Sequence, residues 1–339
     1  MFVASRAPVA GLQNVAAVLD HREELLCEVR VRADRSQRDR LLPFAQPYAL
    51  RVWAVEGARG LGALLAQQLV AAGERVVDVR AKLSARVRIL DNECSDKNDT
   101  HDARSAAMVA LRNRKLRAVA LEDHAAVLRM HAKRHHELTG LRTQAICRLH
   151  AVLATIVAGG LPRNLFADRA ALELRRLRPT DAVGQARRQV AIEHLADVRR
   201  FDRMLVELRP KIVAAVAVSE TTVTDVSGIG VIMAAYVLGY TGDVRRFASK
   251  DRFARYNATA PVSASSRPSP HHRLNLKGNR QINYAMHIAA VTQLAHDSPG
   301  RAYCDRKRAE GKRDKDAMRA LKRRFSDAVY RRLVADARS

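Results

Sequence analysis

The spacing of apolar residues changes along this chain, and that change constrains the fold more than any other feature. In the first third, apolar side chains come in short β-rich runs separated by polar turns. These runs lie at 15–19, 25–31, 50–55 and 75–79, with the polar turn DHRE at 20–23. They predict a hairpin followed by further strands. Helical spacing is found at 60–72 and 100–111, so we expect an α/β domain here.

From residue 123 to 157 the spacing becomes that of a long helix. Apolar residues recur three and four apart, at 138, 141, 145, 149, 152 and 156, which predicts one apolar seam. The pattern returns over 195–208, and Pro210 is expected to end or kink this second helix. Two such helices predict either an antiparallel coiled-coil spacer or a local helical bundle. Beyond residue 219, short helical segments predict a second globular domain.

The charge of the chain points to an anionic partner. The 339 residues include 60 Lys and Arg against 35 Asp and Glu, a net charge of +25. From Arg245 onward there are 23 basic and 8 acidic residues, so this end holds 15 of those charges. An imbalance of this size favours contact with nucleic acid, mainly through phosphates. The alternative for the last stretch, 301–338, is a solvated basic helix with no partner.

The lengths of the apolar runs and the spacing of the cysteines indicate where the protein is located and whether its thiols are reduced. No apolar run approaches the roughly 18 residues that a membrane span needs, so we expect a soluble, cytoplasmic protein. The four cysteines lie more than 40 residues apart. This spacing excludes a zinc ribbon and predicts reduced thiols rather than a disulfide scaffold.

Three carboxylates are candidates for chemistry. Glu56 directly follows the apolar run that ends at Val55, and Asp99 and Asp102 are three residues apart at the start of a predicted helix. The helical spacing lets both aspartates face the same way. Clustered carboxylates bind Mg²⁺, which supports phosphoryl transfer by stabilising the attacking and leaving oxygens. The alternative is that Asp99 only caps the helix and Asp102 favours its dipole.

Two further segments suggest phosphate contacts. The loop SASSR at 263–267 stands between Pro261 and a basic stretch, and a serine beside cations could attack a phosphate. The segment GIG at 228–230 resembles the hairpin of helix-hairpin-helix modules, in which small residues let backbone N–H groups approach a phosphate. An ordinary turn between helices explains that segment equally well.

Other functions have weaker support. The turn GARGLG at 57–62, with Asp78 on the next strand, is only superficially a dinucleotide fingerprint, because its spacing is G-x-x-G-x-G. The chain has no G-x-x-x-x-G-K-[ST] segment, so no ATP motor is predicted. His131 and His135 share a helical face that could bind zinc, but a solvated face is favoured without further ligands nearby.

The motifs taken together resemble one family, the insertion-sequence transposases of the one-ten family, including its one-eleven-eleven branch. The resemblance runs over nearly the whole chain. It rests on WAVEG at 53–57, KNDTHDAR at 97–104, SGIG at 227–230, GDVRRF at 242–247, NATAP at 257–261 and KGNRQINYA at 277–285.

The resemblance implies an α/β plus all-α architecture. An RNase-H-like domain with a D-E-D-D carboxylate set, related to Holliday-junction resolvases, would occupy 1–118. A helical coiled-coil spacer would occupy 119–215, and a mostly helical basic domain with a serine 216–339. DNA transposition would be carried out by a homo-oligomer, guided by a structured RNA from the element and assisted by Mg²⁺.

The site residues implied by the resemblance are carried over motif by motif. The carboxylates, which would also hold the metal, are Glu56, Asp99 and Asp102, and the serine is Ser266 with Ser265 beside it. Phosphate contacts are expected from Gly228, Gly230, Arg273, Lys277 and Arg280.

Two positions depart from the family pattern. Pro8 stands where the first Asp is expected, no acidic residue precedes Asp20, and the opening segment 1–7 is not predicted to be a buried strand. Arg267 stands where the family usually has glycine after the serine. Impaired catalysis is therefore expected, from decay of the element or from an upstream frameshift or displaced start.

Two alternative functions follow: a catalytically inactive nucleic-acid-binding remnant, and a junction-resolving nuclease that does not need Ser266.

Overall fold

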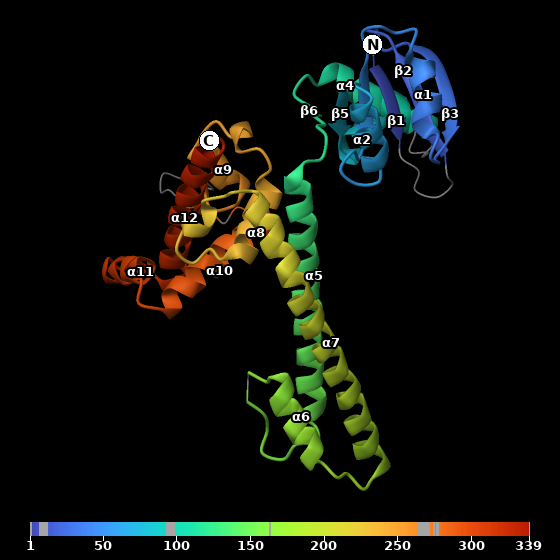
Figure 1. Cartoon of the computed structure of the whole chain (residues 1–339). Coiled ribbons are helices and arrows are strands. Elements are labelled where there is room, and N and C mark those ends of the chain that lie inside the picture. Colours follow the sequence, from blue (N-terminus) through green and yellow to red (C-terminus); the bar gives the residue numbers. More distant parts are fainter. Residues whose placement is uncertain are drawn as a thin grey trace. The chain divides into compact units, whose positions relative to one another are not determined.

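A computed structural model of the chain describes residues 2–6, 13–92, 99–162, 164–263, 272–273, 275 and 278–338. At 2–6, 91–92, 99, 262–263 and 272–273 the description covers the backbone alone. The chain divides into two compact units, Met1–Glu122 and Asp123–Ser339 (Figure 1).

The first unit is built on a six-stranded sheet in the order β3-β2-β1-β4-β5-β6. Its strands are β1 (Phe2–Arg6), β2 (Gln13–Leu19), β3 (Leu25–Arg32), β4 (Val52–Glu56), β5 (Val76–Val79) and β6 (Arg117–Ala118). Strands β1, β4 and β5 are parallel, and β2 and β3 form the predicted antiparallel hairpin. Asp20 makes the hairpin turn, where its carboxylate accepts the N–H groups of Arg22 and Glu24 at 2.8 and 2.9 Å. The mixed α/β character expected of this part is confirmed.

The opening segment forms a strand, contrary to the sequence prediction. Strand β1 is hydrogen-bonded to β2 on one side and to β4 on the other, with Phe2 opposite Val52 and Arg6 opposite Glu56. The short sequence FVASR has few bulky β-formers, so its own preference for a strand is weak. Pairing along both edges satisfies its backbone groups and outweighs that weak preference.

Helices cover both faces of the sheet. Helices α1 (Gln37–Ala45) and α2 (Ala63–Ala71) pack on one face, against side chains that include Trp53 and Val55. Helix α4 (Asp99–Arg112) packs on the other, where Ala54 and Val77 meet its alanine-rich side. Helix α3 (Ala81–Asn92) packs beside α4. The two faces alternate along β4 as the period of a strand requires.

The second unit is helical. Its helices are α5 (His124–Leu153), α6 (Ala167–Arg176), α7 (Ala182–Val218), α8 (Val231–Thr241), α9 (Lys250–Tyr256), α10 (Arg280–Ala295), α11 (Pro299–Ala309) and α12 (Asp314–Asp336). Short 3₁₀ turns, η1 (Val223–Asp225) and η2 (Val244–Arg246), and a two-stranded ribbon of β7 (Val262–Ser263) and β8 (His272–Arg273) connect them. Helices α5 and α7 pack side by side over much of their length (Figure 1). The long helices predicted over 123–157 and 195–208 are therefore present.

Helix α7 runs through Pro210 to Val218, so of the two outcomes predicted for that proline, a helix end or a kink, the helix end is wrong. A proline inside a helix removes one backbone hydrogen bond and costs about 3 kcal/mol. The following turns bury Ile212 and Val216 in the core of the unit. Burial of these side chains offsets the lost bond and keeps the segment helical.

One hydrophobic core runs through the whole second unit, from Leu128 on α5 to Leu333 on α12. The basic C-terminal stretch belongs to this core. Helix α12 buries Leu321, Phe325 and Val329 on one side and carries its charges on the other. Among the residues the structure describes, no helix combines the length and the apolar character that crossing a bilayer requires.

Candidate active site

Glu56 ends β4 on the face that α4 covers. Alternation along the strand places Trp53 and Val55 on the opposite face, whereas Ala54 packs against α4. Glu56, two residues after Ala54, shares the face of Ala54. Its side chain is half-buried, and Oε2 is out of contact with solvent. The carboxylate thus lies at the carboxyl end of the parallel strands.

The direction of α4 brings its first turn toward the same end of the sheet. Its last residue, Arg112, donates from Nε to Glu23 Oε1 at 2.6 Å, in the turn between β2 and β3. That turn follows Leu19, which pairs with Phe2 at the start of β1. Helix α4 therefore ends where β1 and β4 begin. Its 14 residues span about 21 Å, so it begins toward the end that carries Glu56.

Asp102 lies in this first part of α4 and is buried, with 3% of its surface exposed. Its carboxylate forms an ion pair with Arg88 of α3, and both side chains are largely shielded from solvent. A buried carboxylate needs such a partner because desolvation penalises the charged form. No motif in the sequence marks Arg88, because only the packing of α3 on α4 brings it to Asp102.

Asp99 is the first residue of α4, one helical turn before Asp102 on the same side of the helix. Its side chain lies outside the described residues, so the three-carboxylate prediction is untested at that position. Among the side chains that are described, no group of three or more His, Cys, Asp or Glu lies close enough to hold a metal ion. Carboxylate oxygens have the donor chemistry that Mg²⁺ prefers, but Asp102 faces a guanidinium in this arrangement.

The glycine-rich turn at 57–62 is tightly packed. A side chain at Gly62 would place its Cβ 2.7 Å from the carbonyl oxygen of Glu56, and Gly57 adopts a φ of +64°. Asp78, on the next strand, forms an ion pair with Arg59 of the turn at 3.7 Å. These glycines serve the tight connection from β4 to α2.

Gly228 and Gly230 of the predicted hairpin differ in their surroundings. Gly228 has a φ of +91°, and a Cβ there would lie 2.8 Å from the carbonyl oxygen of Ala289 on α10. Gly230 is exposed, caps α8 with a φ of −77°, and has open space around its Cα. Gly228 therefore has a packing role, whereas Gly230 leaves the start of α8 accessible.

We expect Gly228→Ala to lower the free energy of unfolding of the chain by about 2–4 kcal/mol. Alanine is strained at this positive φ, and its Cβ would clash with the carbonyl oxygen of Ala289. Gly230→Ala is the matched control and should change stability by no more than about 0.5 kcal/mol. Urea unfolding followed by circular dichroism measures both. Equal stability of the two variants would contradict the packing role of Gly228.

Of the remaining predicted phosphate contacts, Arg280, at the start of α10, has a described side chain. Arg280 is the exposed first residue of that helix, and Asn279 caps it by accepting the N–H groups of Gln281 and Ile282, both at 3.0 Å. Arg273 lies on β8 opposite Val262, but its side chain is not described. Ser265, Ser266, Arg267 and Lys277 lie outside the described residues.

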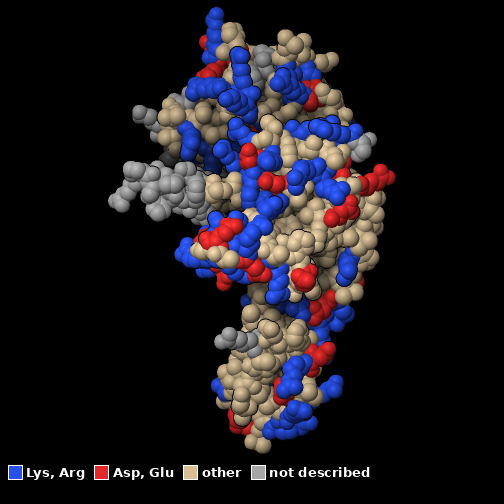
Figure 2. Space-filling view, turned by 90° about the vertical axis from the view of Figure 1, so that its left-hand side faces the viewer, with Lys and Arg blue, Asp and Glu red and all other residues tan. Residues whose placement is uncertain are grey.

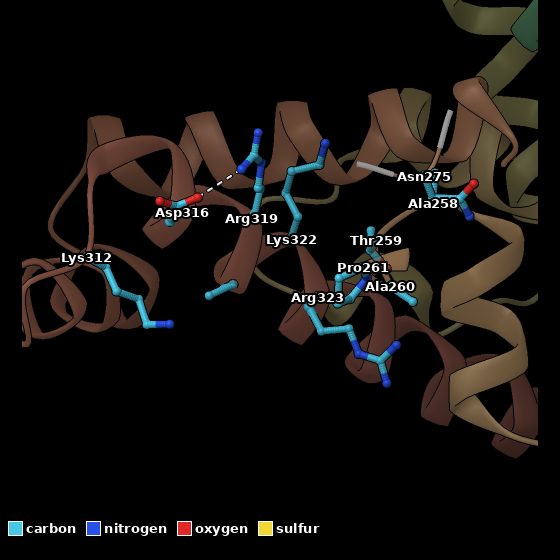
Figure 3. A pocket seen from close by; sticks show the side chains of 11 residues that line it. Ala258, Thr259, Ala260, Pro261, Asn275, Lys312, Asp316, Arg319, Lys322 and Arg323 are labelled. Carbon is cyan, nitrogen blue, oxygen red and sulfur yellow. Dashed lines mark hydrogen bonds and ion pairs between the residues drawn. The ribbon is translucent and has the colours of Figure 1, made fainter. Parts of the chain in front are cut away.

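A cavity of about 350 Å³ lies just after α9, between residues 258–261, which precede Ser266 in the sequence, and helix α12 (Figure 3). The backbone turn 258–261 forms one wall, and α12 forms another. The charged side chains that line it are Lys312, Asp316, Arg319, Lys322 and Arg323. Basic side chains are also common on the face shown in Figure 2, where they are interspersed with carboxylates.

His131, His135 and three of the four cysteines lie among the described residues. His135 Nδ1 lies 3.0 Å from the hydroxyl of Tyr236, and burial lowers the pKa of its imidazole. Within the described part of the chain no cluster of metal ligands surrounds His131 or His135. Cys27, Cys147 and Cys304 are free thiols, and Cys94 lies outside the described residues.

Two family models match this chain. The model of a DEDD transposase of the IS110 type matches residues 9–158, and that of the Transposase IS116/IS110/IS902 family matches residues 220–305. Together they span more than two thirds of the sequence. The first match covers Glu56, Asp99 and Asp102, and it begins one residue after Pro8.

The chain is also similar to curated proteins of bacterial insertion elements. It is 38% identical over 105 residues to an uncharacterized 42 kDa protein of element IS900 from Mycobacterium paratuberculosis, covering 30% of this chain and 26% of that protein. It is 34% identical over 108 residues to an uncharacterized 43.6 kDa protein of element IS110 from Streptomyces coelicolor, covering 32% and 27%. The matches thus span about a quarter of these relatives. Both family models and both relatives agree, and the chain belongs to the IS110 family of insertion-sequence transposases.

Proposed function

We propose that this chain carries out DNA transposition, by cutting and rejoining strands at the ends of its element. The observation that carries this proposal is the position of Glu56 and the first turn of α4 at one end and one face of the sheet. That arrangement brings two separate motifs of the sequence, the one with Glu56 and the one with Asp99 and Asp102, toward the same end of the sheet. The family match supplies the reaction class.

The first unit is proposed to be an RNase-H-like domain. The support is its strand order, in which an antiparallel hairpin continues into parallel strands β1, β4 and β5. In parallel sheets, sites form beyond the carboxyl ends of the strands. Position 8, where the first acid of the family set is expected, lies outside the described residues.

Mg²⁺ is the proposed cofactor, and Glu56, Asp99 and Asp102 would hold it. When bound, the ion would polarise the scissile phosphate. The donor chemistry of these residues fits the ion, and the ion pair joins Arg88 Nη1 to one carboxylate oxygen of Asp102, Oδ1. Arg88 therefore restrains the orientation of the Asp102 carboxylate.

The second unit is proposed to supply the serine and the contacts to nucleic acid. Ser266 Oγ would attack the phosphorus of one strand and form a serine–phosphate ester, while the oxygen of the leaving strand takes up a proton as a hydroxyl. Attack by a strand hydroxyl then reverses this step and frees the serine. Helices α5 and α7 are proposed as the spacer of a homo-oligomer, and a structured RNA of the element as its guide.

The test is recombination of a plasmid that carries the element's own ends and flanks. Mg²⁺ should support the formation of recombinant junctions, and a chelator should abolish it. Junctions are counted by sequencing. Cleavage of branched DNA that persists in a Ser266→Ala variant would instead favour a junction-resolving nuclease.

The second candidate is a catalytically inactive remnant that still binds nucleic acid, which the absence of an acid at position 8 favours. We expect Pro8→Asp to raise recombination at least about tenfold, since a missing ligand weakens the whole carboxylate set. DNA binding should be the same in both proteins. If neither protein recombines DNA while both bind it, the chain is a remnant.

A further inference from the structure

Lys322 of α12 is a half-buried cation with no carboxylate partner among the described residues. Its Nζ donates to Asn283 Oδ1 at 2.6 Å. Burial, together with the nearby Arg319, lowers the pKa of the ammonium group. Its neighbours on the cavity wall are paired differently: Arg319 contacts Asp316 at 2.9 Å, and Arg323 contacts Asp251 at 2.6 Å.

A network of buried amides holds Lys322 in place. Asn283, on α10, also donates to the carbonyl oxygen of Asn257 at 2.9 Å. Asn257 is fully buried, donates to Ser326 Oγ at 2.8 Å, and accepts the N–H and hydroxyl of Thr259 at 3.1 and 2.7 Å. The ammonium group is thereby fixed relative to the turn 258–261, which forms the opposite wall of the cavity.

Close backbone packing restricts which residues can stand beside the turn 258–261. A side chain at Gly278 would place its Cβ 2.7 Å from the backbone nitrogen of Ala258, which itself adopts a φ of +62°. The segments 257–261 and 278–283 therefore pack directly on each other beside α12. Ser266 is the fifth residue after Pro261 in the sequence.

The charge of the cavity favours an anion. Four cations and one carboxylate line it, and that carboxylate already contacts Arg319 (Figure 3). Lys312 and Lys322 are the two cations on the wall with no ion pair among the described residues. Burying an ammonium group away from water is unfavourable unless a counter-charge is present. A cavity of about 350 Å³ accommodates a phosphate group together with part of its sugar.

We infer that this cavity binds one backbone phosphate of the DNA substrate and that Lys322 is the residue that positions it. This inference rests on the proposed function and assigns a role to a residue that lies outside the carboxylate set and the serine loop. Lys322 donates to a phosphate oxygen while retaining its contact with Asn283, since an ammonium group has three donors. The strand is thereby fixed beside the segment that leads to Ser266.

The experiment measures binding of the full chain to a duplex of the element's end as a function of salt. We expect Lys322→Met and Lys322→Gln to weaken binding about tenfold, as loss of one charged hydrogen bond implies. Each should also reduce the slope of log K against log salt by about 0.9, the contribution of one phosphate. Lys322→Arg keeps the charge and should retain most of the affinity and the slope.

Matched controls separate charge from structure. Lys315→Met removes an equal charge from an exposed position on the same helix, outside the cavity, and should leave the affinity within twofold of the parent chain. Lys322→Gln can still donate to Asn283, so a purely structural lysine would bind DNA normally in that variant and overturn the inference.

Two further outcomes are decisive. If the Lys322 variants lose affinity only for an RNA duplex of the same sequence, the assignment to DNA is wrong. If the parent chain binds and recombines DNA but its Lys322 variants keep the full salt slope, this inference fails and the proposed function stands. A parent chain that neither binds nor recombines DNA defeats the proposed function itself.

Discussion

Replacing Asp102 by asparagine is expected to lower strand cleavage at least about 100-fold, because several kcal/mol of transition-state stabilisation depend on the carboxylate set. The same change should reduce the free energy of unfolding by about 3–5 kcal/mol. It leaves Arg88 of α3 buried without a counter-charge. Cleavage is measured on the plasmid substrate with whichever parent recombines, the chain itself or its Pro8→Asp variant.

The double variant Asp102→Asn, Arg88→Met separates the two effects. Removing both charges of a buried pair is often neutral for stability, so most of the lost unfolding free energy should return. Cleavage should not return, since the carboxylate is still absent. If cleavage recovers with stability, Asp102 only holds α3 against α4 and is no part of the catalytic set.

Replacing Ser266 by alanine is expected to abolish strand exchange, by on the order of 10³-fold or more, because no hydroxyl remains to attack the phosphate. DNA binding and stability should be unchanged. The measurement is the protein–DNA adduct on a denaturing gel, with recombinant junctions counted from the same reaction.

Ser265→Ala is the matched control for that prediction, since it removes the neighbouring hydroxyl in the same loop. It should form the adduct at close to the parent rate. An adduct that survives in Ser266→Ala and disappears in Ser265→Ala would move the nucleophile by one residue. An adduct that survives in both would exclude this loop as its source.

Much of the first unit could be predicted because local pattern and tertiary structure agree there. The hairpin of β2 and β3 is marked by two apolar runs and a polar turn, and α4 by its acidic start. Strand β1 could not be predicted, since its partners β2 and β4 stabilise it rather than its own residues. For the same reason α7 continues through Pro210: the favourable burial comes from other helices.

In the candidate site too, features set by local sequence pattern could be predicted, and features set by tertiary packing could not. Glu56 could be placed at a strand end because the apolar run before it is unambiguous. The partner of Asp102 could not be found, because Arg88 meets it only through the packing of α3 on α4. Lys322 is one of many basic residues near the C-terminus, and only the contact with Asn283, 39 residues earlier, distinguishes it.

The close contact between α5 and α8 has a consequence for how relatives can exchange segments. Gly239 of α8 lies so near the backbone of Arg129 that an added Cβ would approach it to 2.4 Å. A chimaera that takes α8 from one relative and α5 from another should therefore fold only if the residue at position 239 stays a glycine or the path of α5 changes to make room for a Cβ.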